Sequence, residues 1–146
     1  MANQLVPQGV VNRLLTSLQV PGFPNLNITA PFLGAAGIRV AFEDVSTEYI
    51  KTLTGAVTSP QPFQLARITA NLLKTQVLAS AYRAQMESNA LLGDGLTLYS
   101  DSAVFPVYTL FNCSIATVPS LDFAGKDADF NVEIAGIYYI NSQLFQ

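Results

Sequence analysis

The sequence predicts a mainly β protein: a β-sandwich or β-barrel with one flanking α-helix and one extended arm. Most of the chain consists of short segments in which apolar and polar residues alternate, separated by prolines and glycines. This pattern is typical of strands joined by turns. One window, residues 75–89, instead has apolar residues at helical spacing. The 146 residues suffice for a single domain, 1–146, with a substantial core.

The N-terminal part predicts three strands. Residues 9–20 are interpreted as a strand because Leu14, Leu18 and Val20 fall on one face, and the prolines and glycine of residues 21–24 then predict a turn. Shorter strands are expected around residues 26–30 and 38–43, with a proline and further glycines between them.

Residues 43–62 differ from the strands on either side. They are rich in Ser and Thr, contain two prolines near their end, and are long for an ordinary connection. Composition alone fits a solvated surface loop equally well. An extended arm or irregular hairpin that contacts a neighbouring subunit would explain why Tyr49, Ile50, Leu53 and Val57 occur in such a segment.

Residues 63–73 predict a strand, and the period then changes to that of a helix over residues 75–89. Thr75 is the predicted N-cap, and Asn89 or Gly93 the predicted end. The apolar stripe of this helix is expected to pack on the core rather than to form a groove for a partner. It consists of Val77, Leu78, Ala81, Tyr82 and Met86.

Three more strands are expected at residues 96–99, 104–118 and 128–140. In the last of these, the apolar side chains of Phe130, Val132 and Ile134 fall on one face. The opposite face is acidic and is either an ordinary solvent face or the wall of a water-filled passage that repels nucleic-acid phosphates. This acidic stripe consists of Asp127, Asp129, Asn131 and Glu133.

The composition argues against an enzyme. The chain has no His and one Cys, so no Ser-His-Asp or Cys-His arrangement exists and the commonest zinc ligand is missing. No phosphate-binding glycine motif occurs. The start of a calcium loop at residues 127–131 fails because Val132 and Tyr138 stand at the Gly and Glu positions. We therefore expect no metal and no cofactor, and Cys113 is interpreted as a small buried apolar residue.

Low charge points to assembly. Charged residues make up 12% of the chain, against roughly 25% in soluble domains. The longest nearly apolar stretch, residues 28–42, is too short to span a bilayer and no signal peptide is evident, so the chain is expected to fold in the cytoplasm. The seven Lys and Arg residues are scattered, so no tight grip on nucleic acid is expected. Much of the surface is expected to lie against other subunits.

Three segments cover most of the chain: VPQGVVNRLLTSLQVPGFPNLNITAPFLGAAGI, TGAVTSPQPFQLARITANLLKTQVLASAYRAQMESN and YTLFNCSIATVPSLDFAGKDADFNVEIAGIYYIN. The chain resembles tail tube proteins of tailed bacteriophages, particularly those with contractile tails. The resemblance lies in the order of these elements and in short sequence segments such as LLKTQ and LDFAGKDADF.

The resemblance implies a structural virion protein of the tail, assembled in the host cytoplasm. Six copies would form a ring whose inner strands join into a β-barrel around a channel, and stacked rings would form the tube through which DNA passes without specific binding. The arm, residues 43–62, would reach an adjacent ring, and the acidic stripe would face the lumen. Expected partners are further copies of the chain, the tail sheath, the baseplate tube initiator and the tail terminator.

Three alternatives stay open at the level of sequence. The inner tube of a phage-derived contractile injection device needs the same stacking ring but carries no genome. A small β-barrel that binds an apolar ligand would also explain the nine Phe and six Tyr residues. An enzyme that uses only carboxylates and Tyr would need two acids in one cleft.

Overall fold

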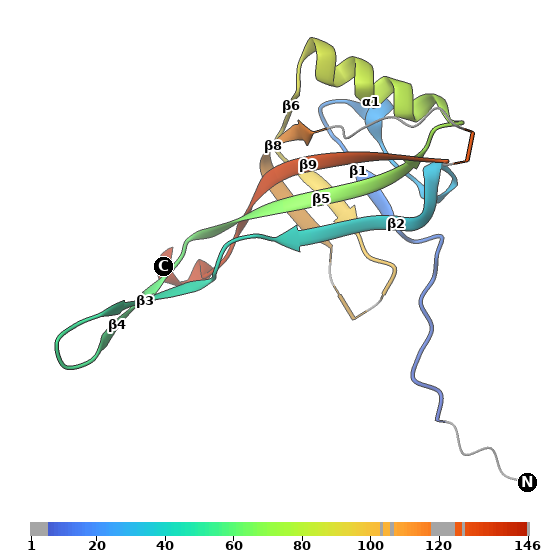
Figure 1. Cartoon of the computed structure of the whole chain (residues 1–146). Helices are drawn as coiled ribbons and strands as arrows, with labels where there is room; N and C mark the ends of the chain where they lie inside the picture. The colour runs from blue at the N-terminus through green and yellow to red at the C-terminus, as the bar shows by residue number, and fades with distance from the viewer. Residues whose placement is uncertain (1–5, 103, 106, 118–124, 127, 146) are drawn as a thin grey trace, which may run out of the picture.

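The computed structural model describes residues 6–102, 104–105, 107–117, 125–126 and 128–145 (Figure 1). Within them, nine strands, one α-helix and three short 3-10 helices follow one another. All strand pairings are antiparallel. The mainly β class, the helix and the arm predicted from the sequence are thereby confirmed.

Seven strands form one sheet in the order β1-β7-β8-β9-β5-β2, with β6 paired to β8. The strands are β1 (Ser17–Gln19), β2 (Leu33–Phe42), β5 (Phe63–Leu73), β6 (Leu91–Gly93), β7 (Leu96–Tyr99), β8 (Tyr108–Thr117) and β9 (Asp129–Tyr139). The remaining strands, β3 (Thr47–Lys51) and β4 (Ala56–Pro60), form a hairpin of their own between β2 and β5.

The long strands β5 and β9 form the centre of the sheet. They pair without interruption from Phe63 opposite Tyr139 to Leu73 opposite Asp129. Alternate residues of both strands are buried, as their sequence pattern predicts. β5 spans the predicted residues, whereas β8 begins at Tyr108, four residues later than predicted.

The buried face of β5 and β9 lies in one hydrophobic cluster with β1 and β7. That cluster contains Leu18 of β1, Leu98 of β7, and Ile68 and Ile134 of the central strands. The sheet therefore folds over on itself and has two parts. β8 belongs to both parts, because its first residues pair with β7 and its later residues pair with β9. No polar or charged residue is buried in the described part of the chain.

Helix α1 (Val77–Ser88) covers one edge of this core. It buries Leu78 and Tyr82, and the Tyr82 hydroxyl donates a hydrogen bond to the Leu26 carbonyl at 2.6 Å. Asn89 is the C-cap, as predicted, but Gln76 rather than Thr75 is the N-cap. Val77 was expected in the core and is 81% exposed, because it stands at the first position of the helix, beyond the core.

The predicted strand at residues 9–20 is wrong for most of its length, because only Ser17–Gln19 finds a partner strand. A turn fixed by Asn12 precedes it, in which the Asn12 side chain accepts the Leu14 amide at 2.9 Å. Of the predicted strand at residues 26–30, a single antiparallel β-bridge forms, between Ile28 and Leu18. Two 3-10 helices, Pro24–Leu26 and Ala30–Phe32, limit it on either side, and each has a proline in its first turn.

No helix in the described ranges is long and apolar enough to cross a membrane.

Candidate functional site

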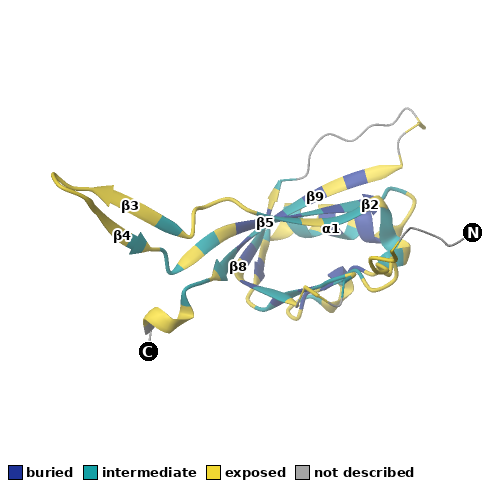
Figure 2. Cartoon of the chain, turned by 90° about the horizontal axis from the view of Figure 1, so that it is seen from below, coloured by how far each residue is buried: buried dark blue, intermediate teal, exposed yellow. Residues whose placement is uncertain are grey.

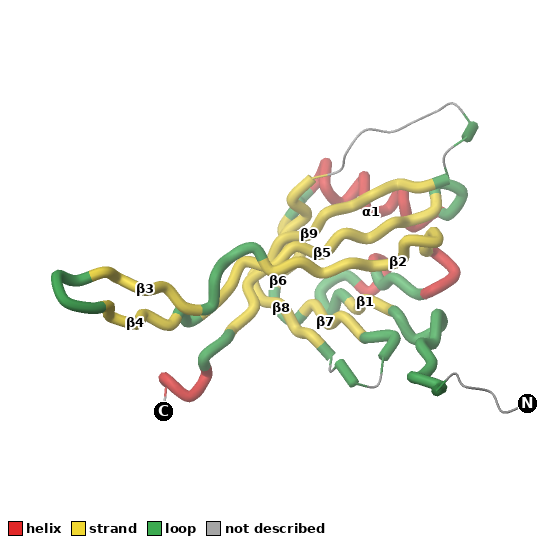
Figure 3. The backbone as a smooth tube through the Cα atoms, turned by 60° about the horizontal axis from the view of Figure 1, so that its bottom comes forward, coloured by secondary structure: helices red, strands yellow, loops and turns green. Residues whose placement is uncertain are grey.

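The hairpin of β3 and β4 projects from one end of the molecule, and we call residues 43–62 the arm. Figures 1 and 3 show it leaving the body on the side opposite to the N-terminal segment. Its turn is closed by the Thr52 amide, which donates to the Gly55 carbonyl at 2.9 Å, and by the Gly55 amide, which donates to the Thr52 hydroxyl at 3.1 Å. The predicted extended arm is confirmed, and its hairpin is regular rather than irregular, because β3 and β4 pair without a register shift.

Both faces of the hairpin carry uncovered apolar side chains. Ile50 and Val57 stand opposite each other and are both 53% exposed. Tyr49 points to the other face and is 68% exposed, and Leu53 at the turn is fully exposed. Figure 2 shows the hairpin as mostly exposed. A two-stranded hairpin is marginal alone in water, so these side chains are expected to gain burial from a partner.

The base of the arm is fixed to the body by hydrogen bonds. The Asn141 side-chain amide donates to the Gln61 carbonyl at 2.7 Å and to the Ser46 carbonyl at 3.2 Å, joining both strands of the arm to the end of β9. Asp44 accepts the Leu65 amide at 3.2 Å, and Gln64 donates to the Asp44 carbonyl at 2.7 Å. The direction of the arm is therefore set by the fold.

The face of β2, β5 and β9 that points away from the core is polar over more than half its length. We call this part the polar half; it consists of Arg39, Arg67, Thr69, Asn71, Asn131 and Glu133. At its centre, Arg67 forms ion pairs with Glu43 at 2.8 Å and with Glu133 at 2.9 Å. Hydrogen bonds to Glu133 and Glu43 raise the pKa of Arg67 above its usual value.

The same face becomes apolar next to the arm. We call this part the apolar end; it consists of Phe63, Leu65, Phe111, Ile137 and Tyr139. Four of its side chains are at least one-third exposed, and the rings of Phe111 and Tyr139 lie 5.3 Å apart. A sheet face that meets water is ordinarily polar, so an apolar end of this kind is typical of a contact surface.

The surface around the predicted acidic stripe is not uniformly acidic. Asp129, Asn131 and Glu133 lie on the outward face of β9, as the alternation predicts. Glu133 is neutralised by Arg67 from the neighbouring strand. The Asp129 carboxylate lies against Gly34 of β2, where a Cβ atom would collide with it. Asp127 lies outside the described residues.

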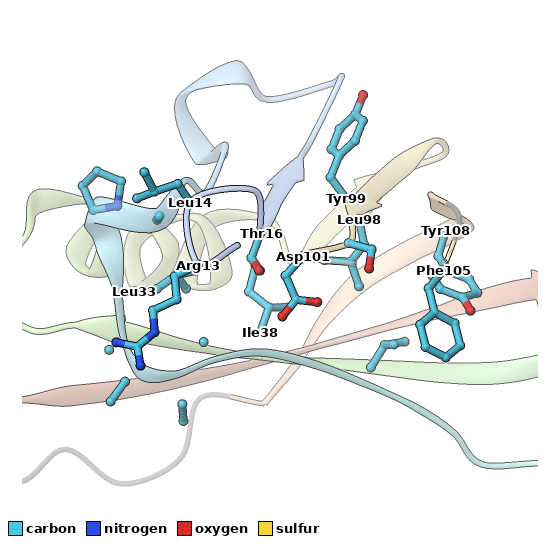
Figure 4. Close-up of a pocket in the computed structure, with 18 residues that line it drawn as sticks. Arg13, Leu14, Thr16, Leu33, Ile38, Leu98, Tyr99, Asp101, Phe105 and Tyr108 are labelled. Atoms are coloured by element: carbon cyan, nitrogen blue, oxygen red, sulfur yellow. The ribbon is translucent and has the colours of Figure 1, made fainter. Parts of the chain in front are cut away.

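A groove of about 820 Å³ opens between the edge strand β2 and the other end of the sheet (Figure 4). Leu33 and Ile38 line it from β2, and Leu98 and Tyr99 from β7, with Arg13 and Asp101 at its polar side. The core cluster fills the space between the two parts of the sheet, so the groove is a surface feature.

The described residues offer little reactive chemistry. They contain no group of three or more acids or cysteines that could hold a metal ion. Cys113 is buried, and its burial raises the pKa of the thiol to about 12, with the Asp94 charge adding to the effect. The thiol therefore stays protonated at neutral pH and is a poor nucleophile.

Sequence reasoning missed the residues that depend on strand register. Arg67 and Glu133 are 66 positions apart, and nothing in either segment predicts their contact. The same holds for the apolar end, whose members come from three strands. The alternation of β5 and β9 is visible in the sequence, and pairing these two strands in register would have found both features.

No model of a known protein family matches the chain, and a search of curated proteins likewise finds no match.

Proposed function

We propose that this chain is a structural subunit that assembles into stacked rings, six subunits to a ring, and so forms the inner tail tube of a contractile-tailed bacteriophage. The observation that carries the proposal is the arm. It is fixed at its base, projects away from the body, and carries uncovered apolar side chains on both faces. Such an element is expected to be buried in an assembly.

The edge of the sheet supports the same proposal. β2 is ten residues long and is paired only on its β5 side in the described sheet. A free edge of this length favours pairing with another chain. Head-to-tail contacts that close by rotation produce rings, so a subunit with a long free edge at β2 and a projecting arm suits both ring closure and ring stacking.

The polar half would form the channel wall in such a tube. Glu133 of this surface and Glu43 beside it hold Arg67 in ion pairs, so this cation is not free to bind phosphates. A wall without clustered free cations lets DNA pass without being held. The acidic stripe contributes Asn131 and Glu133 to this wall, and the chain would reside in the tail of the virion after assembly in the host cytoplasm.

The proposal implies several partners, and each of them depends on the proposal. Besides further copies of the chain, they are the tail sheath, the baseplate tube initiator and the tail terminator. The inner tube of a phage-derived injection device would use the same arm and edge, and differs only in carrying no genome.

The groove favours a second candidate function, the binding of an apolar ligand. Its walls include Leu33, Ile38 and Leu98, and its size is that of ordinary ligand sites. This function leaves the uncovered arm unexplained. A ligand-binding protein is expected to remain a monomer or small oligomer, whereas a tube subunit is not.

Removing the arm tip tests the proposal. Deletion of residues 52–59 takes away Leu53 and Val57 but leaves the anchoring residues Asn141 and Asp44 in place. We expect a folded subunit, judged by circular dichroism, that no longer forms large particles in sedimentation velocity, while the intact chain does so at rising concentration. Unchanged particle size after the deletion would contradict the role of the arm.

A further inference from the structure

The apolar end is continuous across three strands. Phe63 pairs directly with Tyr139, and Leu65 with Ile137. Phe111 of β8 stands opposite Ile137 on its other side. Phe63, Leu65 and Tyr139 are 41%, 46% and 57% exposed. The surface is thus a single patch rather than scattered apolar residues.

The ion pairs of Arg67 mark where this patch stops. Glu43 beyond β2, Arg67 on β5 and Glu133 on β9 cross the face at nearly one level. Beyond them lies the polar half, and on the arm side lie the uncharged side chains of the apolar end, with the Asp44 carboxylate bound to the Leu65 amide at its margin. The division indicates that one part of a single sheet face meets water and the other is covered in the working protein.

The molecule's own arm does not cover the patch. Asn141 and Asp44 fix the base of the arm so that its strands lead away from the body (Figures 1 and 3). Ile50 and Val57 are 53% exposed, as they would not be if they lay against the patch. The patch and the arm are therefore two uncovered apolar surfaces of one chain that do not meet within it.

We infer that the apolar end receives the arm of a second copy of this chain. The inference rests on the proposed function, since it names the surface that the arm contacts. Three strands span about 10 Å at a spacing of ~4.8 Å, which matches the breadth of one hairpin with its side chains. Ile50 and Val57 would lie against Phe63 and Tyr139, with no formal charge among the four.

A second copy of the patch is a poorer occupant than the arm. Patch against patch is a two-fold contact that closes as a dimer and leaves both arms uncovered. An arm in a neighbour's patch leaves the neighbour's arm free for the next copy. The contact is therefore heterologous and continues from each copy to the next.

Cross-linking between single-cysteine variants tests the inference. Full-length Val57→Cys and affinity-tagged Leu65→Cys are mixed and oxidised under native conditions, where the buried Cys113 is protected. We expect a disulfide-linked heterodimer in the mixture and no dimer from either variant alone. Val77→Cys, on α1 and 81% exposed, replaces Leu65→Cys as the control and is expected to give no heterodimer. Tyr139→Cys serves in place of Leu65→Cys if that variant does not fold.

Sedimentation of the same mixtures separates this inference from the proposed function. Large particles without the heterodimer would overturn the inference alone. Heterodimer without large particles would support the inference and contradict the tube. Neither product would contradict both, and a dimer formed by Leu65→Cys alone would show patch against patch and overturn the inference. Leu65→Lys is further expected to raise the concentration needed for assembly about tenfold or more, because the contact would bury an unpaired charge, whereas Val77→Lys leaves it unchanged.

Discussion

Position 136 is a glycine, and the structure leaves no room there for a side chain. A Cβ atom on Gly136 of β9 would lie 2.7 Å from the Cys113 sulfur and 3.1 Å from the Leu110 Cβ, both on β8. Glycine here lets β8 and β9 approach each other inside the core. The residue is needed for packing and not for backbone freedom.

Gly136→Ala is therefore expected to lower the free energy of unfolding by about 1–3 kcal/mol, the usual cost of overpacking a core. Gly55→Ala is the matched control, since a Cβ atom there meets nothing within 4 Å. Urea denaturation measures both. Equal stability of the two variants would contradict the close packing of β8 against β9.

Cys113 gives a dependence of stability on pH. Burial raises the pKa of its thiol from 9.0 to about 12. Between these values the unfolded chain loses the proton while the folded chain keeps it, so the contribution of the thiol to stability is full below pH 9.0 and falls as the pH rises.

The difference in unfolding free energy between the wild type and Cys113→Ala isolates this contribution, because other titrating groups cancel. On raising the pH from about 8 to about 10.5, the difference is expected to change by about 2 kcal/mol in favour of the variant, at ~1.4 kcal/mol per pH unit. A difference that does not vary with pH would show that the thiol is open to solvent.

At the scale of elements, the hydrogen bonds of Asn141 hold the arm in place. Asn141 itself has a left-handed backbone, with φ of 53°, so glycine keeps its backbone conformation and removes only the side-chain amide. In Asn141→Gly, amide hydrogen exchange is expected to become faster in β3 and β4 and to stay unchanged in β5 and β9.

Asn112→Gly is the control for this exchange experiment, since Asn112 also has a positive φ, of 50°, but lies on β8. Its arm amides are expected to exchange as in the wild type. Equal exchange in the arms of both variants would mean that the direction of the arm does not depend on Asn141.

How far the sequence predicts an element depends on whether the element has its partner within the chain. The strand at residues 63–73 was predicted to the residue, because β9 pairs with it along its whole length. Residues 9–16 lack a regular alternation, because Val10–Val11 and Leu14–Leu15 are adjacent apolar pairs, and no strand of the described structure pairs with them. A strand needs both an alternating pattern and a neighbour to pair with.

The candidate surfaces follow the same rule. The uncovered apolar residues of the arm were predicted because they are adjacent in sequence. The apolar end and the ion pairs of Arg67 were not, because they arise only when β2, β5, β8 and β9 are placed in register. The arm can therefore be predicted from the local sequence pattern, whereas the surface proposed to receive it depends on long-range strand pairing.

At the scale of the whole molecule, the core is well buried but many apolar side chains outside it are exposed. The core is apolar, and the described residues contain no buried side-chain polar atom without a hydrogen-bond partner. Many of the exposed apolar residues lie in the arm, in the apolar end beside it and in the N-terminal segment, where Val10 is 95% exposed, and a further group lies at Val104, Phe105 and Val107. A subunit with a well-satisfied core and such uncovered surfaces is suited to completing its burial in an assembly.

Negative-stain electron microscopy of the purified full-length chain at rising concentration tests this account most directly. We expect rings that stack into hollow tubes of uniform diameter, with sixfold symmetry in end views. Particles that remain the size of one subunit at every concentration would contradict self-assembly as the function of the arm and the sheet edge.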